Sequence, residues 1–263
     1  MRYAVLSDVH ANLHALDVVL AAARRDGVDA FLCAGDLVGY GAFPNECVQR
    51  LRSVDAVCVA GNHDLIATGR LDDRRTGPAA RQSLRWTRDV LHADTAAFLT
   101  DLPTRVVMPG LAMTHGSLDD VEEYVRADAR ARELLTRLPE LGGAVALLVL
   151  GHTHEPWAVG MQGGTLLRRR TGTCALPEDE SHLLNPGSVG QSRDVSPDAR
   201  YLLVDLERRR ASFRAVRYDV RACVDALLRM GLPADNCHAP PARSERLRAR
   251  VHGLARRIRR GPA

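Results

Sequence analysis

Short apolar runs recur along the first 150 residues, and polar or glycine-containing sequence follows each of them. Runs of this kind are typical of buried β-strands, and five stand out: residues 3–7, 30–34, 56–60, 111–113 and 145–150. After the first two of them, residues 12–25 and 44–52 place apolar side chains at helical spacing. Gly27 is a stop signal after the first helix, and Pro44 suits the first turn of the second. This alternation predicts an α/β domain that begins with parallel strands.

The pattern changes after residue 154, where strands and turns replace the alternation of strands and helices. Four apolar runs there indicate antiparallel strands: residues 157–160, 165–170, 201–206 and 211–217. Upstream, residues 72–102 carry a helical pattern that opens with a polar stretch, and residues 127–138 form a helix that ends before Pro139. The apolar segments on either side of Pro109 and Gly110 predict a hairpin. The sequence therefore predicts an α/β fold with an antiparallel second half.

Polar side chains that can bind metals come directly after the five predicted strands. They are Asp8, His10, Asp36, Asn62, His63, Asp64, His115, His152 and His154. In an open α/β sheet, ligands bind beyond the carboxyl ends of the strands, so these segments can meet at one edge. Carboxylate, imidazole and amide oxygen without a thiolate suit Mn, Fe, Zn or a similar divalent ion.

These segments resemble, in order, the motifs of the calcineurin-like metallophosphoesterase family: DxH, GD, GNH(D/E), H and GHxH. Here they read Asp8-Val9-His10, Gly35-Asp36, Gly61-Asn62-His63-Asp64, His115 and Gly151-His152-Thr153-His154. Residues 35–41 and 185–191 are also similar to one bacterial branch of that family. The resemblance covers residues 1–219 and implies a β-sandwich of two sheets flanked by α-helices, in four layers (αββα). The chain departs from the commonest pattern at Ala11, where many members have glycine, and we expect a changed loop shape there without an effect on metal binding.

The resemblance implies two divalent ions, with manganese among the candidates. One ion would take Asp8, His10, Asp36 and His154, and the other Asp36, Asn62, His115 and His152. Asp36 would bridge the ions by giving one oxygen to each. The resemblance implies that His63 acts as a general acid or stabilises charge on the leaving-group oxygen, with Asp64 orienting its imidazole. Two ions about 4 Å apart can hold a shared hydroxide and clamp phosphoryl oxygens.

We therefore expect an enzyme that hydrolyses a phosphate mono- or diester, small or nucleotide-like, by direct attack of the metal-bridging hydroxide. Two alternatives stay open at this stage. A metal-dependent nuclease would use the basic C-terminus to bind nucleic acid. A metal-binding scaffold without catalysis is less favoured, because such family members lack the motif histidine that is present here as His63.

The net charge of +4 is unevenly distributed along the chain. All 36 basic residues are arginine, so a catalytic lysine is excluded. Residues 243–260 hold eight arginines and one acid, which gives +7 and leaves −3 for the rest. The same stretch puts four apolar residues on one helical face: Leu247, Val251, Leu254 and Ile258. We therefore expect a helical, Arg-rich extension over residues 220–263 beside a phosphoesterase domain over residues 1–219. Docking on the body or in a homodimer is favoured for it over binding nucleic acid.

Neither a run of 18 apolar residues nor a signal-peptide pattern is present in the sequence. A cytoplasmic location without membrane attachment is the expectation that follows. The six cysteines form no C-x-x-C pair, which favours buried thiols over disulfides or a cysteine-bound zinc ion.

Several residues near the motifs have two interpretations. Asn12 is expected to cap a helix rather than bind phosphate, and His14 to lie on a helix surface or behind the ligands rather than bind metal. Tyr40 could stack on a base or pack on its own loop. Residues 185–188 read as a structural turn, although Ser188 or Arg193 could reach substrate. Four histidines match no motif and are predicted at the surface: His92, His182, His238 and His252.

Overall fold

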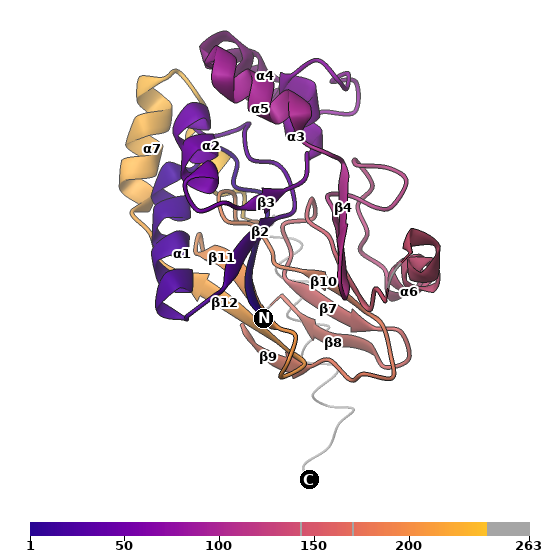
Figure 1. The fold of residues 1–263 in the computed structure, drawn as a ribbon. Coiled ribbons are helices and arrows are strands. Elements are labelled where there is room, and N and C mark those ends of the chain that lie inside the picture. The colour runs from indigo at the N-terminus through magenta and orange to yellow at the C-terminus, as the bar shows by residue number, and fades with distance from the viewer. Residues whose placement is uncertain (143, 170, 241–263) are drawn as a thin grey trace, which may run out of the picture.

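The computed structural model describes residues 1–142, 144–169 and 171–240, and these form two six-stranded sheets packed face to face (Figure 1). The first sheet has the order β3-β2-β1-β11-β12-β9, with β1 (Arg2–Leu6), β2 (Ala30–Cys33), β3 (Val57–Cys58), β9 (Gly172–Ala175), β11 (Ala199–Asp205) and β12 (Arg210–Val216). The second has the order β4-β5-β6-β10-β7-β8, with β4 (Arg105–Met108), β5 (Leu111–Thr114), β6 (Leu147–Val149), β7 (Trp157–Gly160), β8 (Gly164–Arg168) and β10 (His182–Asn185).

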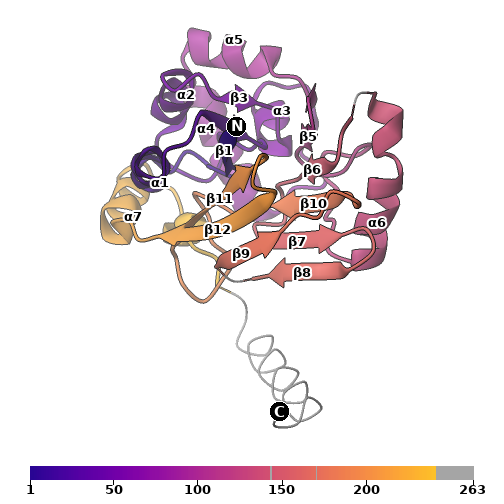
Figure 2. The same ribbon diagram turned by 60° about the horizontal axis from the view of Figure 1, so that its bottom comes forward.

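Helices cover the outer sides of both sheets. On the first sheet lie α1 (Leu13–Arg25), α2 (Pro44–Arg52) and α7 (Val220–Arg229), whereas α6 (Asp128–Thr136) lies on the second (Figures 1 and 2). At one end of the sandwich stand α3 (Asn62–Ala67), α4 (Pro78–Val90) and α5 (Ala93–Asp101). Two short 3-10 segments follow α6 and α7: η1 (Leu138–Leu141) and η2 (Ala234–Cys237). This arrangement confirms the predicted four-layer fold.

Three apolar layers hold the sandwich together. Side chains alternate between the two faces of a strand, so Leu202 of β11 packs between the sheets while Leu203 packs toward α1. On the far side, Leu134 of α6 packs against Leu183 of β10. Strands such as β1, β5 and β6 are therefore buried on both faces, which explains why they read as continuous apolar runs.

Parallel pairing brings the ends of several strands together. β1 pairs parallel with β2, and β2 pairs parallel with β3. In the second sheet β5, β6 and β10 are parallel to one another. The polar segments identified from the sequence follow β1, β2, β3, β5 and β6, which agrees with the prediction that they come directly after strands.

Two strands that the hydrophobic pattern did not predict complete the sheets. They are β9 and β10, each four residues long. β10 begins at His182 and ends at Asn185, and these polar ends obscure a strand that is buried in the middle of its sheet. The prediction that His182 lies at the surface is wrong, because its side chain is fully buried. His92 is exposed as predicted, His238 is partly buried, and His252 lies outside the described residues.

The helical pattern over residues 72–102 corresponds to two helices, because the chain becomes extended at Leu91 and His92. The short helix α3 was not predicted. It begins at Asn62, and the carboxylate of Asp64 accepts a hydrogen bond from the Gly61 amide before the first turn. A capping interaction of this type sets the start of a helix.

The described part of the C-terminal segment packs on the body of the protein. Leu227 of α7 and Cys237 of η2 belong to an apolar cluster with Ala42, close to Phe43. The Arg-rich stretch over residues 243–260 lies outside the described residues. In the part of the chain that the structure covers, no helix has the length and apolar character needed to cross a bilayer. All six cysteines are free thiols.

Truncation of a leucine between the sheets should show how far the fold depends on that layer. Leu202 is fully buried there, whereas Leu228 on α7 is 58% exposed. Leu202→Ala should lower the free energy of unfolding by about 2–5 kcal/mol, and Leu228→Ala by less than about 0.5 kcal/mol. Urea denaturation of the two variants measures the difference. Equal, small losses would contradict the assignment of Leu202 to a tightly packed layer.

Candidate metal centre

The loops after five strands bring the predicted metal ligands to one place. Each of these side chains is buried: Asp8, His10, Asp36, Asn62, His115, His152 and His154. Three groups of side chains could hold an ion, with ligand atoms within 4.8 Å of one another: Asp8, His10 and His154; His10, Asp36 and His63; and Asp36, His115 and His152. The first and third groups match the two ligand sets implied by the resemblance, apart from Asp36 in the first and the amide of Asn62 in the third.

Backbone strain is concentrated in these loops. In the described part of the chain, ten residues other than glycine have a left-handed φ, and seven of them belong here: Asp8, His10, Ala11, Asp36, Tyr40, His152 and His154. Such a conformation costs of order 1–3 kcal/mol for each residue and persists only where its surroundings enforce it. The strain aims the side chains inward, so it is a signature of a site rather than of ordinary loops.

Ala11 has a φ of +51°, a conformation that glycine adopts more readily. This left-handed backbone conformation explains why glycine is common at this position in the family. The loop keeps a glycine-like conformation at Ala11, and the amide of Ala11 still donates to the carbonyl of Leu37 at 2.9 Å.

Backbone carbonyls fix the orientation of the four candidate histidine ligands. One ring nitrogen of each lies near a carbonyl oxygen: His10 Nδ1 and Val38 (3.2 Å), His115 Nδ1 and Ala34 (2.7 Å), His154 Nδ1 and Gln191 (2.7 Å), and His152 Nε2 and Glu122 (3.1 Å). A carbonyl oxygen can only accept a hydrogen bond, so each of these nitrogens carries a hydrogen and is the donor. The other ring nitrogen is then the one that can bind a metal: Nε2 of the first three histidines and Nδ1 of His152. Metal-binding histidines are commonly held in this way.

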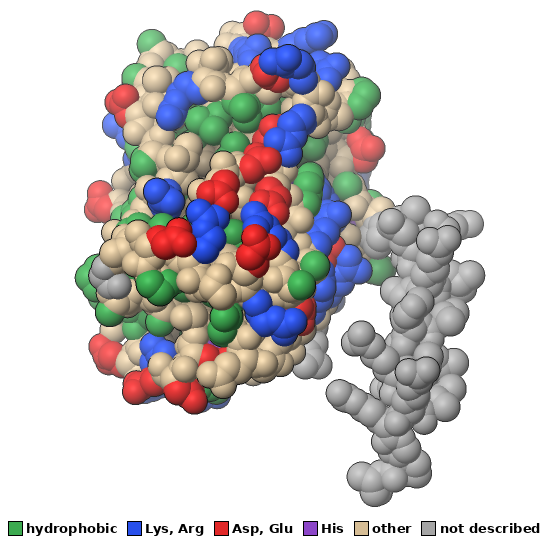
Figure 3. Space-filling view, turned by 90° about the vertical axis from the view of Figure 1, so that its right-hand side faces the viewer, with side chains coloured by type: hydrophobic (Ala, Val, Ile, Leu, Met, Phe, Trp, Pro, Cys, Tyr) green, Lys and Arg blue, Asp and Glu red, His purple; other side chains and the backbone are tan. Residues whose placement is uncertain are grey.

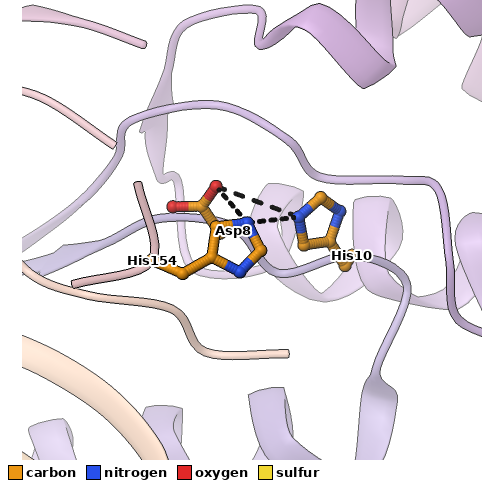
Figure 4. A group of neighbouring side chains, drawn as sticks. All are labelled: Asp8, His10 and His154. Carbon is orange, nitrogen blue, oxygen red and sulfur yellow. Dashed lines mark hydrogen bonds and ion pairs between the residues drawn. The ribbon is translucent and has the colours of Figure 1, made fainter. Parts of the chain in front are cut away.

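Acceptor atoms meet at close range around Asp8 (Figure 4). Nε2 of His10 lies 3.1 Å from Nε2 of His154, and the Oδ1 atom of Asp8 lies 3.2 Å from the latter. Burial lowers the pKa of His10 and of His154, which disfavours a proton as the bridge between them. Within the described residues, neither carboxylate oxygen of Asp8 has a hydrogen-bond donor. A cation between these atoms would remove the repulsion, and the donor set fits a divalent metal.

Asp36 lies between the two groups. Its Oδ2 atom is 3.1 Å from Nε2 of His115 and 3.7 Å from Nε2 of His10. Its Oδ1 atom accepts a hydrogen bond of 2.8 Å from the amide of His63. Asp36 is therefore close to a histidine of each group, and the prediction that it gives one oxygen to each ion stays a prediction.

The pKa values of Asp36 and His115 are shifted because the two side chains lie close together. Burial alone would raise the pKa of Asp36, but His115 and His63 outweigh it and hold that pKa well below its usual range. Burial would lower the pKa of His115, yet the negative charge of Asp36 raises it to about 9. Oδ1 of Asn62 is buried without a hydrogen-bond donor from the described residues. An amide oxygen left in this state fits a ligand of a hard or borderline metal ion.

Asp64 has a different role from the predicted one. Its carboxylate accepts hydrogen bonds from the amides of Leu37 (2.9 Å), Val38 (3.1 Å) and Gly61 (2.9 Å). The prediction that Asp64 orients the imidazole of His63 is therefore wrong. Asp64 instead joins the loop that carries Asp36 to the loop that carries Asn62.

His63 lines a cavity next to the candidate metal ligands. Its ring contacts the rings of His10 and Tyr40, with both centroid separations at 4.8 Å. Burial lowers the pKa of His63, so the neutral imidazole is favoured near pH 7. Tyr40 therefore packs on histidines of the site and also lines the cavity.

The segment from Asn185 to Arg193 supports the metal loops from behind. The hydroxyl of Ser188 and the amide of Gly190 both donate to the carbonyl of Asp8, each at 2.9 Å. The side-chain amide of Asn185 donates to the carbonyl of Gly151. These hydrogen bonds confirm that the segment is a structural turn, and the hydroxyl of Ser188 binds the Asp8 carbonyl within it. Arg193 does reach the cavity.

At the start of α1, Asn12 and His14 have the roles that the sequence favoured. Asn12 caps the helix, because its side-chain oxygen accepts from the amide of Ala15 at 3.1 Å. His14 packs edge-on against Phe43, with ring centroids 5.4 Å apart, and lies outside the three ligand groups.

A cavity of about 290 Å³ opens over the metal-ligand residues. It is lined by Asp36, Tyr40, Asn62, His63, Arg75, Thr76, Gly77, Ala80, Glu122, Tyr124, His152, His154 and Arg193. Arg75, Glu122 and Tyr124 were not predicted individually, since they come from two loops that carry no motif. Arg75 joins these loops through ion pairs with Asp120 (2.9 Å) and Glu122 (3.1 Å).

Comparison with known proteins agrees with this fold and site. Residues 1–209 match the calcineurin-like phosphoesterase superfamily domain. The chain belongs to this superfamily, so the resemblance drawn from its motifs is confirmed. Membership of this family supports the hydrolysis of phosphoesters as the activity of the chain, and the family generally depends on divalent metals.

Relatives come from distant organisms. An uncharacterised protein of Methanocaldococcus jannaschii is 31% identical over 236 residues, covering 88% of this chain and 93% of the relative. A metallophosphoesterase of Sphaerobacter thermophilus has a similar structure, with a TM-score of 0.77, 32% identity, and coverage of 90% of this chain and 97% of that one. A hypothetical protein of Pyrococcus horikoshii shares the fold with a TM-score of 0.76 at 18% identity, covering 92% of this chain and 99% of that one.

The glycine before His152 provides a test of how tightly the loops are packed. A Cβ atom on Gly151 would lie 2.0 Å from Oγ of Ser7 and 2.9 Å from the carbonyl oxygen of Ala34. Gly151→Ala should therefore lower the free energy of unfolding by about 1–3 kcal/mol and weaken metal binding. Gly163→Ala is the control, because its Cβ would meet neighbours at 3.7 Å or more. Thermal melts and metal titration of both variants measure this, and a Gly151→Ala protein matching the control would contradict the packing described.

Proposed function

We propose that this chain is a phosphoesterase that uses two divalent ions held on either side of Asp36. The observation that carries the proposal is the shared position of Asp36 between two groups of buried acceptor atoms. One ion would be held by Asp8, His10, Asp36 and His154, and the other by Asp36, Asn62, His115 and His152. When bound, such a pair lowers the pKa of water and neutralises charge on phosphoryl oxygens.

The residues of the chain complete the reaction around this centre. Water attacks phosphorus directly, the bond to the leaving oxygen breaks, and no covalent enzyme intermediate forms. His63 lines the cavity beside the ligands, and its lowered pKa favours a neutral ring that donates an N–H to the leaving oxygen. That hydrogen bond offsets part of the charge that develops as the bond breaks, and the leaving oxygen takes its proton from solvent.

The cavity favours a small phosphate ester, including nucleotide-like ones, over a polymer. Its volume of about 290 Å³ is at the lower end of the range for small-molecule sites. On the face that carries α6, basic and acidic side chains are interspersed (Figure 3), and Arg130 and Arg137 of this region are paired with Glu123 and Asp119. A nuclease would bind nucleic acid through a basic surface, and this face does not offer a continuous one.

Removal of the bridging carboxylate tests the dinuclear proposal. Asp36→Asn should lose metal from both sites, because one side chain serves both ligand groups. Elemental analysis of the purified variant after metal loading measures the ratio of metal to protein. Asp17→Asn is a suitable control, since Asp17 is an exposed carboxylate paired with Arg50. Retention of two ions with full activity in Asp36→Asn would rule out bridging.

Loss of the non-ligand histidine tests the catalytic proposal. His63→Ala should keep its metal and fold but lose turnover of an aryl phosphate by about 10²–10³-fold, the usual loss when one hydrogen-bond donor to developing charge is removed. His92→Ala changes an exposed histidine and serves as the control. Steady-state kinetics with saturating metal separate the two. Wild-type turnover in His63→Ala would contradict the catalytic role proposed for His63.

A further inference from the structure

Arg193 differs from the other arginine that lines the cavity. Arg75 is neutralised by Asp120 and Glu122 at the rim. Arg193 also lines the cavity, but among the described residues no carboxylate lies within ion-pair distance of it. Its guanidinium carbon lies 5.9 Å from the ring centre of Tyr124. Burial alone would lower the pKa of Arg193, but Tyr124, Tyr40 and Asp8 together raise it, so the guanidinium keeps its charge. Because no carboxylate in the described part of the chain pairs with it, this charged group can bind an anion that enters the cavity.

Arg193 shares its cavity with four of the candidate metal ligands, Asp36, Asn62, His152 and His154. It belongs to the same segment as Gln191, whose carbonyl accepts the proton of His154 Nδ1 at 2.7 Å. Burial and the positive charge of Arg193 both lower the pKa of His154. Tyr40 and Tyr124 line the same cavity, and Tyr124 stacks on His152 with ring centroids 4.0 Å apart. Because the guanidinium and these ligands line one cavity, an anion bound there can contact both.

We propose that Arg193 binds a non-bridging oxygen of the substrate phosphate and makes the site selective for phosphate monoesters. The proposal rests on the phosphoesterase function above and adds the class of ester. A monoester has three non-bridging oxygens and a diester has two. Two oxygens can be engaged on the side of the metal-ligand residues, and the third oxygen of a monoester remains for Arg193. The planar guanidinium can also donate two parallel hydrogen bonds to phosphate, which an ammonium group cannot.

The first test measures binding of inorganic phosphate by isothermal titration calorimetry, both to the metal-free and to the manganese-loaded protein. Arg193→Ala should weaken phosphate binding by about 10- to 100-fold, the usual loss for a hydrogen bond between charged groups. Arg193→Lys keeps the charge without the planar fork and should be intermediate. Arg126→Ala is the matched control, because exposed Arg126 lies 4.6 Å from the same Tyr124 ring but is not among the residues that line the cavity.

The second test compares an aryl phosphate monoester with the matching diester. Arg193→Ala should lower kcat/KM for the monoester by about 10- to 100-fold, mainly through KM, and for the diester by less than about 3-fold. Equal losses on both esters, or phosphate binding in Arg193→Ala equal to that of Arg126→Ala, would overturn the proposal. If the metal-loaded wild type hydrolyses neither ester, the phosphoesterase function fails, and the calorimetric contrast still decides whether Arg193 binds phosphate.

Discussion

The structure depends on one electrostatic constraint: several buried acceptor atoms face one another with too few donors between them. Nδ1 of His10 and Nδ1 of His154 donate hydrogen bonds to backbone carbonyls. The Nε2 atoms of these two histidines, which keep their lone pairs, therefore lie 3.1 Å apart. The carboxylate of Asp8 adds negative charge at the same point, 3.2 Å from Nε2 of His154. Buried acceptor atoms without a cation among them are costly, and the proposed metals would remove that cost.

The rest of the fold holds this arrangement in place. Strained left-handed residues in the loops aim the ligands, and hydrogen bonds between loops enforce the strain. Asp64 joins the loops of Asp36 and Asn62, while Ser188 and Gly190 secure the carbonyl of Asp8. The two sheets supply a rigid base, because the strands that carry the loops are buried on both faces. Residues remote from the chemistry thus determine the geometry of the site.

Much of the fold and the candidate ligand set could be predicted from the sequence, because both depend on local signals. Apolar runs mark the first strands, and polar side chains at their ends share one edge of the sandwich by topology. What the sequence did not reveal depends on tertiary contacts. β10 is obscured by its polar ends, and the partner of the Asp64 carboxylate is a set of amides from another loop. Arg75 and Tyr124 reach the cavity from loops without a motif, so only the fold identifies them.

The central claim is that two metal ions share Asp36, and electron paramagnetic resonance of the manganese-loaded protein tests it most directly. Two Mn(II) ions about 4 Å apart with a common carboxylate should be exchange-coupled. The account therefore predicts the spectrum of a coupled pair, which should give way to that of uncoupled ions when loading is substoichiometric. A fully loaded protein that shows only the six-line signal of isolated Mn(II) would contradict it.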